Sequence, residues 1–213
     1  MKTYLFHNPE SVTQEQFELE MLPLLPQWRK EQTLRYKFLM GRVQCASAFI
    51  LLKNGLKNDF GIEEEIEFDY VANEKPVLRH HPDIHFNLSH CKKGVLCVID
   101  ETAPIGCDIE AVERGISDSL LNYCCNAQEI RSIENSTNPN VEFIRLWTIK
   151  EAVLKCSGEG IVSNLRDLLS PRLLSGLEME THPCLEEGFV YTICRKRSNM
   201  SFYSSVPKPS RLK

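Results

Sequence analysis

Apolar side chains recur at helical spacing between residues 27 and 54 of the chain. The pair Asn54-Gly55 follows them, and glycine readily adopts the backbone conformation that closes a helix. The pattern therefore predicts one long helix over residues 27–54. The side chains expected on its apolar face are separated by three, four or seven positions: Leu34, Phe38, Cys45, Phe49 and Leu52.

Shorter apolar runs predict strands in the middle of the chain. They lie at residues 66–70, 84–88, 94–99 and 105–111. Residues 75–82 are expected to form a loop, because two prolines interrupt them. The stretch between the last two strands has turn chemistry, so we expect those strands to form a hairpin.

The second half of the chain is more helical in its pattern. We expect helices at residues 120–133 and 141–156, the second closed by Ser157-Gly158. Strands are expected at residues 190–194 and 201–204, and a disordered tail at residues 207–213. Helices and strands occur in both halves, which predicts a mixed α+β fold.

The composition places the chain among globular proteins. Its 213 residues allow one domain or two small halves that share a core. Hydrophobic residues make up 42% and charged residues 25%, which argues against a disordered, collagen-like or coiled-coil chain. No apolar run reaches the length of about 18 residues that marks a spanning helix, and the N-terminus lacks a signal-peptide run. We therefore expect a cytoplasmic protein with no membrane partner.

The nine cysteines do not form a recognisable metal or redox motif. Only Cys124 and Cys125 are close in sequence, and no C-x-x-C occurs. This spacing argues against a zinc ribbon or a thioredoxin motif. We expect buried, reduced thiols, as in most cytosolic proteins.

The charge is unevenly distributed, although the net value of −4 is mild. Residues 27–57 contain seven basic residues and one acid, a local balance of +6. Such a segment can mark a bound phosphate or polyanion, or it can be a solvated helix face.

Two carboxylates alternate along the expected strand at residues 105–111. Alternate residues of a strand share a face, so Asp108 and Glu110 point the same way and Cys107 and Ile109 point the other way. Carboxylates on one face repel each other unless a cation lies between them, and oxygen ligands suit Mg²⁺. The alternative is an ordinary solvent-facing edge strand.

A second group of polar residues repeats at helical spacing near residue 150. Trp147, Glu151 and Lys155 are four positions apart and therefore form one line on the expected helix. An acid followed by a lysine one turn later suits a metal ion next to an anionic group. The alternative is a common surface pair between Glu151 and Lys155.

A third motif, Asn87-Leu88-Ser89-His90, ends the expected strand at residues 84–88. The serine and the histidine can donate to a phosphate, or they can be structural. No partner at a suitable spacing indicates a serine hydrolase, and G-x-S-x-G, G-x-G-x-x-G and P-loop motifs do not occur.

Taken together, these motifs resemble the 4'-phosphopantetheinyl transferases, in particular the longer single-chain type represented by the surfactin-synthetase activator. The resemblance covers about residues 1–205 and rests on four segments in the family's order and spacing: Lys75-Pro76, Asn87-Leu88-Ser89-His90, Gly106-Cys107-Asp108-Ile109-Glu110 and Trp147-Thr148-Ile149-Lys150-Glu151-Ala152-Val153-Leu154-Lys155. Cys107 departs from the family's usual aliphatic residue, which is a mild change.

The resemblance implies a metal site and a set of catalytic residues. Asp108, Glu110 and Glu151 match the Mg²⁺ ligands, and Lys155 matches a diphosphate contact. Asp108, Glu151 and Lys155 are the expected catalytic residues, with Glu151 as the candidate base for the incoming hydroxyl. Glu129 resembles a further acid of the family near the carrier site.

The resemblance also implies coenzyme A contacts. Arg42 is our choice for the 3'-phosphate, and Lys30, Arg35 and Lys37 compete with it. The full set of expected contacts is as follows: Arg42, Lys75, Pro76, Ser89, His90, Lys150 and Lys155.

By the same resemblance, two similar α/β halves form a pseudo-dimer with the active site in the cleft between them. The expected halves are residues 1–103, with coenzyme A contacts, and residues 104–206, with the metal site. The implied reaction moves the phosphopantetheine arm of coenzyme A to a serine of an apo acyl or peptidyl carrier protein and releases adenosine 3',5'-bisphosphate. We expect a monomer with no nucleic-acid partner. The alternatives are a Mg²⁺-dependent phosphodiesterase or nuclease, and an inactive coenzyme A-binding module.

Overall fold

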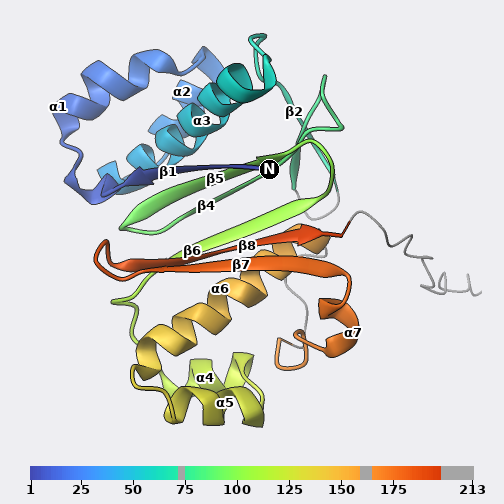
Figure 1. The fold of residues 1–213 in the computed structure, drawn as a ribbon. Helices are drawn as coiled ribbons and strands as arrows, with labels where there is room; N and C mark the ends of the chain where they lie inside the picture. The colour runs from blue at the N-terminus through green and yellow to red at the C-terminus, as the bar shows by residue number, and fades with distance from the viewer. Residues whose placement is uncertain (72–74, 159–164, 198–213) are drawn as a thin grey trace, which may run out of the picture.

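The computed structural model describes residues 1–71, 75–158 and 165–197 of the chain, and Figure 1 shows its layers of helices and strands. The N-terminal elements run from β1 to β5: β1 Lys2–His7, the short helical segments η1 Pro9–Ser11, α1 Gln14–Gln16, η2 Phe17–Met21 and η3 Leu22–Leu24, then α2 Gln27–Leu34, α3 Leu39–Phe60, β2 Phe68–Tyr70, β3 Pro76–Leu78, β4 His85–His90 and β5 Gly94–Asp100.

The remaining elements complete the mixed α+β fold that the sequence predicts. They begin with a strand and end with two: β6 Ile105–Ala111, α4 Asp118–Cys124, α5 Ala127–Glu134, α6 Pro139–Ser157, α7 Pro171–Leu174, β7 Leu177–Cys184 and β8 Phe189–Lys196. None of the helices in the described ranges combines the length and the apolar character needed to cross a membrane.

Two antiparallel three-stranded sheets form the centre of the fold. Their strand orders are β1-β5-β4 and β6-β8-β7, so in each sheet the last strand lies between the other two. Strands β2 and β3 pair separately. Figure 1 shows the two sheets next to each other, with α3 over the outer face of one and α6 over the outer face of the other.

Three apolar layers hold these elements together. Val43, Phe49 and Leu56 of α3 pack against the first sheet. Leu96 and Val98 of β5 belong to a second cluster, which lies between the sheets. Similar clusters join α6 to β8. Successive residues of a strand point to opposite faces of its sheet, so these layers determine which side chains of each strand are buried and against which neighbour.

The prediction of one helix over residues 27–54 is wrong, because the helix is interrupted between Leu34, where α2 ends, and Leu39, where α3 begins. Phe38 is extended there (φ −102°, ψ 146°). The break lets α2 fold back on α3, where the Trp28 ring meets the Phe49 ring edge-on at 5.5 Å. Of the expected apolar face, Cys45, Phe49 and Leu52 are buried, but Leu34 and Phe38 are exposed.

The predicted end of that helix at Asn54-Gly55 is also wrong. Helix α3 continues to Phe60, and Gly61 ends it with a positive φ of 68°. Gly55 serves a different purpose, because a Cβ there would come within 2.8 Å of Tyr4 and Ile99 side-chain atoms. The missing side chain lets α3 approach the sheet closely.

The predicted hairpin of residues 94–99 and 105–111 does not form. Strand β5 has β1 on one side and β4 on the other, so neither edge is free for β6. Asp100 ends β5 by accepting hydrogen bonds from Thr102 N at 2.7 Å and Ala103 N at 3.1 Å. The chain then crosses to the second sheet, where β6 pairs with β8.

The other predictions have mixed outcomes. The strand at residues 105–111 and the helix at residues 141–156 are confirmed within β6 and α6, and Gly158 ends α6 with a φ of 74°. The expected helix at residues 120–133 is split at Asn126, whose side chain caps α5. The expected loop at residues 75–82 contains β3, which Pro76 begins. The expected strand at residues 201–204 and the tail at residues 207–213 lie outside the described residues.

Candidate active site

Strand β6 presents its polar residues to α6. Gly106 lies against this helix, since a Cβ there would come within 2.3 Å of the Ala152 carbonyl oxygen. Asp108 and Glu110 follow at alternate positions on the same face. Cys107 and Ile109 are buried between the sheets. The structure therefore agrees with the orientation that the alternation along this strand predicts.

Helix α6 brings a lysine to the first of these carboxylates. Lys155 Nζ donates to Asp108 Oδ1 at 2.6 Å and to Ser89 Oγ at 3.1 Å. Trp147, two turns earlier on the same line of the helix, lies under the Arg114 guanidinium, 4.6 Å from the ring centroid. The line of residues predicted for this helix thus faces the predicted acids.

Side chains rather than backbone hydrogen bonds join β4 to β6. Ser89 Oγ donates to Asp108 Oδ1 at 2.8 Å and accepts from the Ile109 N–H at 3.3 Å. Asn87 Oδ1 accepts from the Cys107 N–H at 2.8 Å. The Asn87-Leu88-Ser89-His90 motif therefore links the two sheets, and this role of Asn87 was not anticipated from the sequence.

Negative charge accumulates around Asp108. Burial and the Asp108 carboxylate raise the pKa of both Glu110 and Glu151. Burial opposes the charged form of Lys155, but the Asp108 carboxylate and the other acidic groups nearby together outweigh it and raise the pKa of Lys155. Three carboxylates thus share one region with Lys155 and Arg114.

Arg114 is a functional candidate that the sequence analysis missed. Its guanidinium pairs with the Glu110 carboxylate and stacks on Trp147. The available signal was the spacing of four residues between Glu110 and Arg114, directly after the strand. Arg114 partly neutralises Glu110 in the absence of another cation.

The donor set around Asp108 suits a hard divalent cation. Asp108 Oδ2 is buried and has no hydrogen-bond partner. The Glu151 carboxylate makes no hydrogen bond or salt bridge with the side chain of another described residue, although the charges of Lys155 and Arg114 act on it. Carboxylate oxygens are what Mg²⁺ prefers, and a cation would relieve the charge that raises the pKa of Glu110 and Glu151. As they stand, no three metal-ligating side chains within the described ranges converge closely enough to hold an ion.

Lys75 and His90 border this cluster. Lys75 Nζ donates to the carbonyls of Ile105 at 3.2 Å and Lys155 at 2.5 Å, and its burial lowers its pKa. Pro76 follows it in a shallow hollow beside His85. His90 ends β4 and is exposed on part of its surface. Desolvation of the ring and the charge of Lys155 lower the pKa of His90.

Lys150 and Arg42, two further expected coenzyme A contacts, also make interactions within the protein. Lys150 is 2% exposed, and its Nζ donates to Glu129 Oε2 at 2.7 Å and to the carbonyls of Cys124 and Leu165. It therefore faces α4 and α5 instead of Asp108. Arg42 Nε donates to the Tyr36 carbonyl at 2.9 Å.

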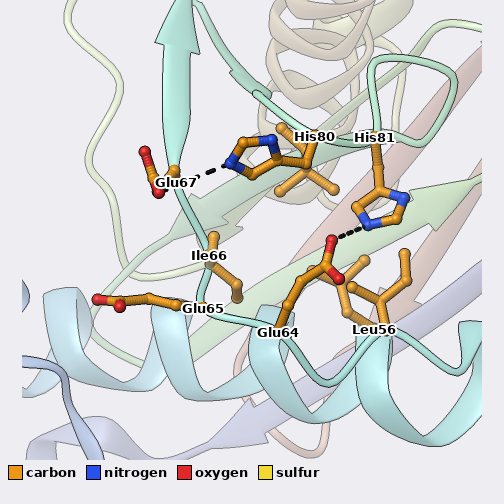
Figure 2. Close-up of a pocket in the computed structure, with 9 residues that line it drawn as sticks. Leu56, Glu64, Glu65, Ile66, Glu67, His80 and His81 are labelled. Atoms are coloured by element: carbon orange, nitrogen blue, oxygen red, sulfur yellow. Dashed lines mark hydrogen bonds and ion pairs between the residues drawn. The ribbon is translucent and has the colours of Figure 1, made fainter.

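A separate group of ionisable side chains lies in a small hollow over Leu56 of α3. Figure 2 shows His81 directed at Glu64 and His80 directed at Glu67, with Ile66 between the two pairs. Both histidines contact acids on the surface, and neither reaches Asp108 or Lys155. This hollow provides control positions for experiments on the candidate site.

The comparisons with known proteins agree with the motifs. Residues 104–194, which carry Asp108, Glu110, Glu151 and Lys155, match the family described as the 4'-phosphopantetheinyl transferase superfamily. The chain is 27% identical over 192 residues to the 4'-phosphopantetheinyl transferase psf-1 of Bacillus pumilus, covering 84% of this chain and 82% of the relative.

Two further relatives carry the same description. The 4'-phosphopantetheinyl transferase Sfp of Bacillus subtilis (strain 168) is 27% identical over 176 residues, which are 81% of this chain and 77% of Sfp. The 4'-phosphopantetheinyl transferase HetI of Nostoc sp. (strain PCC 7120) is 35% identical over 136 residues, which are 60% of this chain and 56% of HetI. The resemblance seen in the sequence is thereby confirmed.

Proposed function

We propose that this chain, whose residues 104–194 belong to the 4'-phosphopantetheinyl transferase superfamily, transfers the phosphopantetheine arm of coenzyme A to a serine of an apo carrier protein. One observation carries the proposal: Lys155, Asp108 and Ser89 form a single hydrogen-bonded group inside a cluster of acids. The three residues come from α6, β6 and β4, and such a convergence is hard to explain as surface charge.

In the proposed reaction the serine oxygen attacks the phosphorus that bears the pantetheine arm. A P–O bond forms to the serine, and the anhydride P–O bond breaks. Adenosine 3',5'-bisphosphate leaves with the bridging oxygen, and the serine proton passes to a base. Lys155, which lies beside Asp108, is the proposed donor to the diphosphate and would stabilise the charge that develops there.

Glu151 is the proposed base. Burial and the nearby Asp108 carboxylate raise its pKa, so its carboxylate holds a proton more readily than an exposed glutamate does. Asp108, Glu110 and Glu151 are the proposed ligands of Mg²⁺, which when bound would neutralise phosphate charge as a Lewis acid. Coordination by Glu151 competes with its role as a base, so a water held by Glu151 is the alternative acceptor.

Lys75, Pro76, Ser89 and His90 are the proposed contacts of coenzyme A, because they border the acidic cluster on the side of β3 and β4. Arg42 is the proposed partner of the 3'-phosphate, with Lys30, Arg35 and Lys37 as the alternatives in the basic segment. Lys150 remains a proposed contact only if its buried pair with Glu129 opens.

The proposed architecture is a pseudo-dimer with the active site between residues 1–103 and residues 104–206. It is supported by the shared strand order of the two sheets, β1-β5-β4 and β6-β8-β7, each covered by one long helix. Ser89 comes from one half and Asp108 from the other. A single chain therefore supplies both sides of the proposed site, in keeping with a monomer.

The proposed compartment is the cytoplasm. All nine cysteines are free thiols, and a reducing environment keeps thiols in that state. The partner is proposed to be an acyl or peptidyl carrier protein in its apo form.

The test is intact-mass analysis of several apo carrier proteins after incubation with coenzyme A and Mg²⁺. A carrier should gain about 340 Da, the mass of one phosphopantetheine arm, once only and on its serine. Changing that serine to alanine, or chelating the metal, should stop the gain. Coenzyme A binding without any mass gain would favour a binding module, and release of nucleotide from DNA or RNA would favour a nuclease.

A further inference from the structure

The turn between α2 and α3 exposes an unusual amount of apolar surface. Leu34, Tyr36 and Phe38 are 46%, 48% and 70% exposed. They account for three of the ten exposed large hydrophobic residues in the described part of the chain, and they lie within five consecutive positions. Exposed apolar side chains are ordinary when scattered, but a cluster of them marks an interaction surface.

The turn is held in a defined conformation. Arg42 Nε donates to the Tyr36 carbonyl at 2.9 Å, across the first turn of α3. The Tyr36 ring packs on Gly41, where a Cβ would come within 2.8 Å of the ring. Thr33 Oγ1 donates to Cys45 Sγ at 3.3 Å, which joins the end of α2 to α3. The exposed side chains are therefore presented by an ordered backbone.

The charge around the turn has one sign. Residues 32–57 contain five basic residues and no acid. Lys37 Nζ lies 5.4 Å from the centroid of the Phe38 ring, so a cation sits directly at the apolar surface. Aromatic side chains beside basic ones fit a partner that presents carboxylates around apolar side chains.

The turn is connected to the candidate active site. Gln44, six residues after Phe38 in α3, donates from Nε2 to the Cys91 carbonyl at 2.9 Å. Cys91 follows His90 and Ser89, and Ser89 is hydrogen-bonded to Asp108. A protein that binds at residues 34–38 would thus rest beside the end of β4 that reaches the acids.

We propose that Leu34, Tyr36 and Phe38, with Lys37, form the docking surface for the acidic face of the apo carrier protein. This inference rests on the proposed transferase function. Coenzyme A alone does not account for the surface, because its phosphates would pair with basic side chains and its single adenine ring would cover at most one of the three apolar side chains. Docking here would hold the carrier's serine near His90, beside the proposed catalytic residues of α6 and β6.

The decisive variant is Phe38→Ser, and Leu19→Ser is its matched control. Both side chains are 70% exposed, and neither belongs to the buried clusters. We expect Phe38→Ser to raise the KM for the apo carrier about tenfold, as for the loss of an aromatic anchor, with kcat and the KM for coenzyme A unchanged. Leu19→Ser should change none of these constants, and the melting temperatures of both variants should match that of the parent protein.

A charge exchange tests the partner. Lys37→Glu should weaken binding of the acidic carrier and so raise its KM. A carrier in which glutamates of the docking face are changed to lysine should be modified faster by Lys37→Glu than the unchanged carrier is. A rise in the KM for coenzyme A without change for the carrier would overturn the proposal and make the turn part of the cofactor site. An unchanged carrier KM in Phe38→Ser would overturn it as well. Failure of the proposed function is distinct, because the parent protein would then modify no carrier at all.

Discussion

Lys155 Nζ lies 2.6 Å from Asp108 Oδ1, and this contact joins the end of α6 to the centre of β6. Ser89 of β4 donates to the same carboxylate oxygen, so three elements meet at one atom. The second oxygen of Asp108 is buried without a partner. A buried carboxylate with an unused oxygen is a costly arrangement for stability alone, which makes Asp108 the first position to test.

Asp108→Asn should reduce transfer at least roughly a hundredfold, as for the loss of a catalytic metal ligand. The amide oxygen retains an acceptor for Ser89 and Lys155, so the fold should persist by circular dichroism. The exposed Asp69→Asn, taken from a surface pair with Arg79, is the matched control and should keep full activity. Full Mg²⁺-dependent transfer by Asp108→Asn would remove this residue from the metal site.

Glu151→Gln should stabilise the protein at neutral pH while lowering transfer. Burial and Asp108 raise the pKa of Glu151 in the folded state, so the folded protein holds this proton more tightly than the unfolded chain. That contribution to stability is present at low pH and is lost as the pH rises through the folded-state pKa. Glutamine carries no charge at any of these pH values, so this loss of stability does not occur. The free energy of unfolding at neutral pH should rise by an amount on the order of 0.5–2 kcal/mol.

Urea unfolding with chelator present, from about pH 4 to about pH 8, measures this difference. The gain from Glu151→Gln should shrink as the pH falls toward 4.5, the ordinary value for a glutamate. The exposed Glu186→Gln is the control and should show no such trend. If Glu151→Gln is less stable than the parent at neutral pH, the hypothesis that crowded negative charge around Asp108 destabilises the fold is wrong.

Coenzyme A should bind the parent protein more tightly as the pH falls through the pKa of His90. Desolvation and Lys155 hold this pKa below its ordinary value of 6.5 in the free protein, so the ring is mostly neutral at pH 7. Protonation creates a phosphate partner, and one linked proton gives at most about tenfold in affinity per pH unit.

His90→Ala should lose this component of the pH dependence, as measured by calorimetry at several pH values. Comparison of the two proteins cancels the titration of the ligand's own phosphate. His81→Ala removes a surface histidine of the hollow in Figure 2 and should behave like the parent protein. The same pH dependence in His90→Ala as in the parent would exclude His90 from the phosphate site.

Lys150→Met should destabilise the protein by about 3 kcal/mol, because it leaves the Glu129 carboxylate buried without its cation. The double variant Lys150→Met/Glu129→Gln should recover much of that loss, which equilibrium unfolding in urea measures. Unchanged stability together with a tenfold higher KM for coenzyme A would instead assign Lys150 to the cofactor, as the family resemblance implies.

The sequence by itself determined the parts of the site that lie within one element. Alternation along residues 105–111 places Asp108 and Glu110 on one face, and the four-residue spacing along residues 141–156 aligns Trp147, Glu151 and Lys155. Both predictions hold because backbone geometry fixes the direction of a side chain relative to its own strand or helix. The α+β class followed from the same local patterns.

The tertiary structure decided which of these faces meet. Strand β5 is covered on both edges, so β6 pairs with β8 and not with its neighbour in sequence. Lys150 and Glu151 are adjacent in sequence, but a helix turns about 100° per residue, so one meets Glu129 and the other faces Asp108. Leu34 and Phe38 fit an apolar helical stripe, but the break after α2 leaves both exposed. Periodicity defines a face, and only the packed fold determines what lies against it.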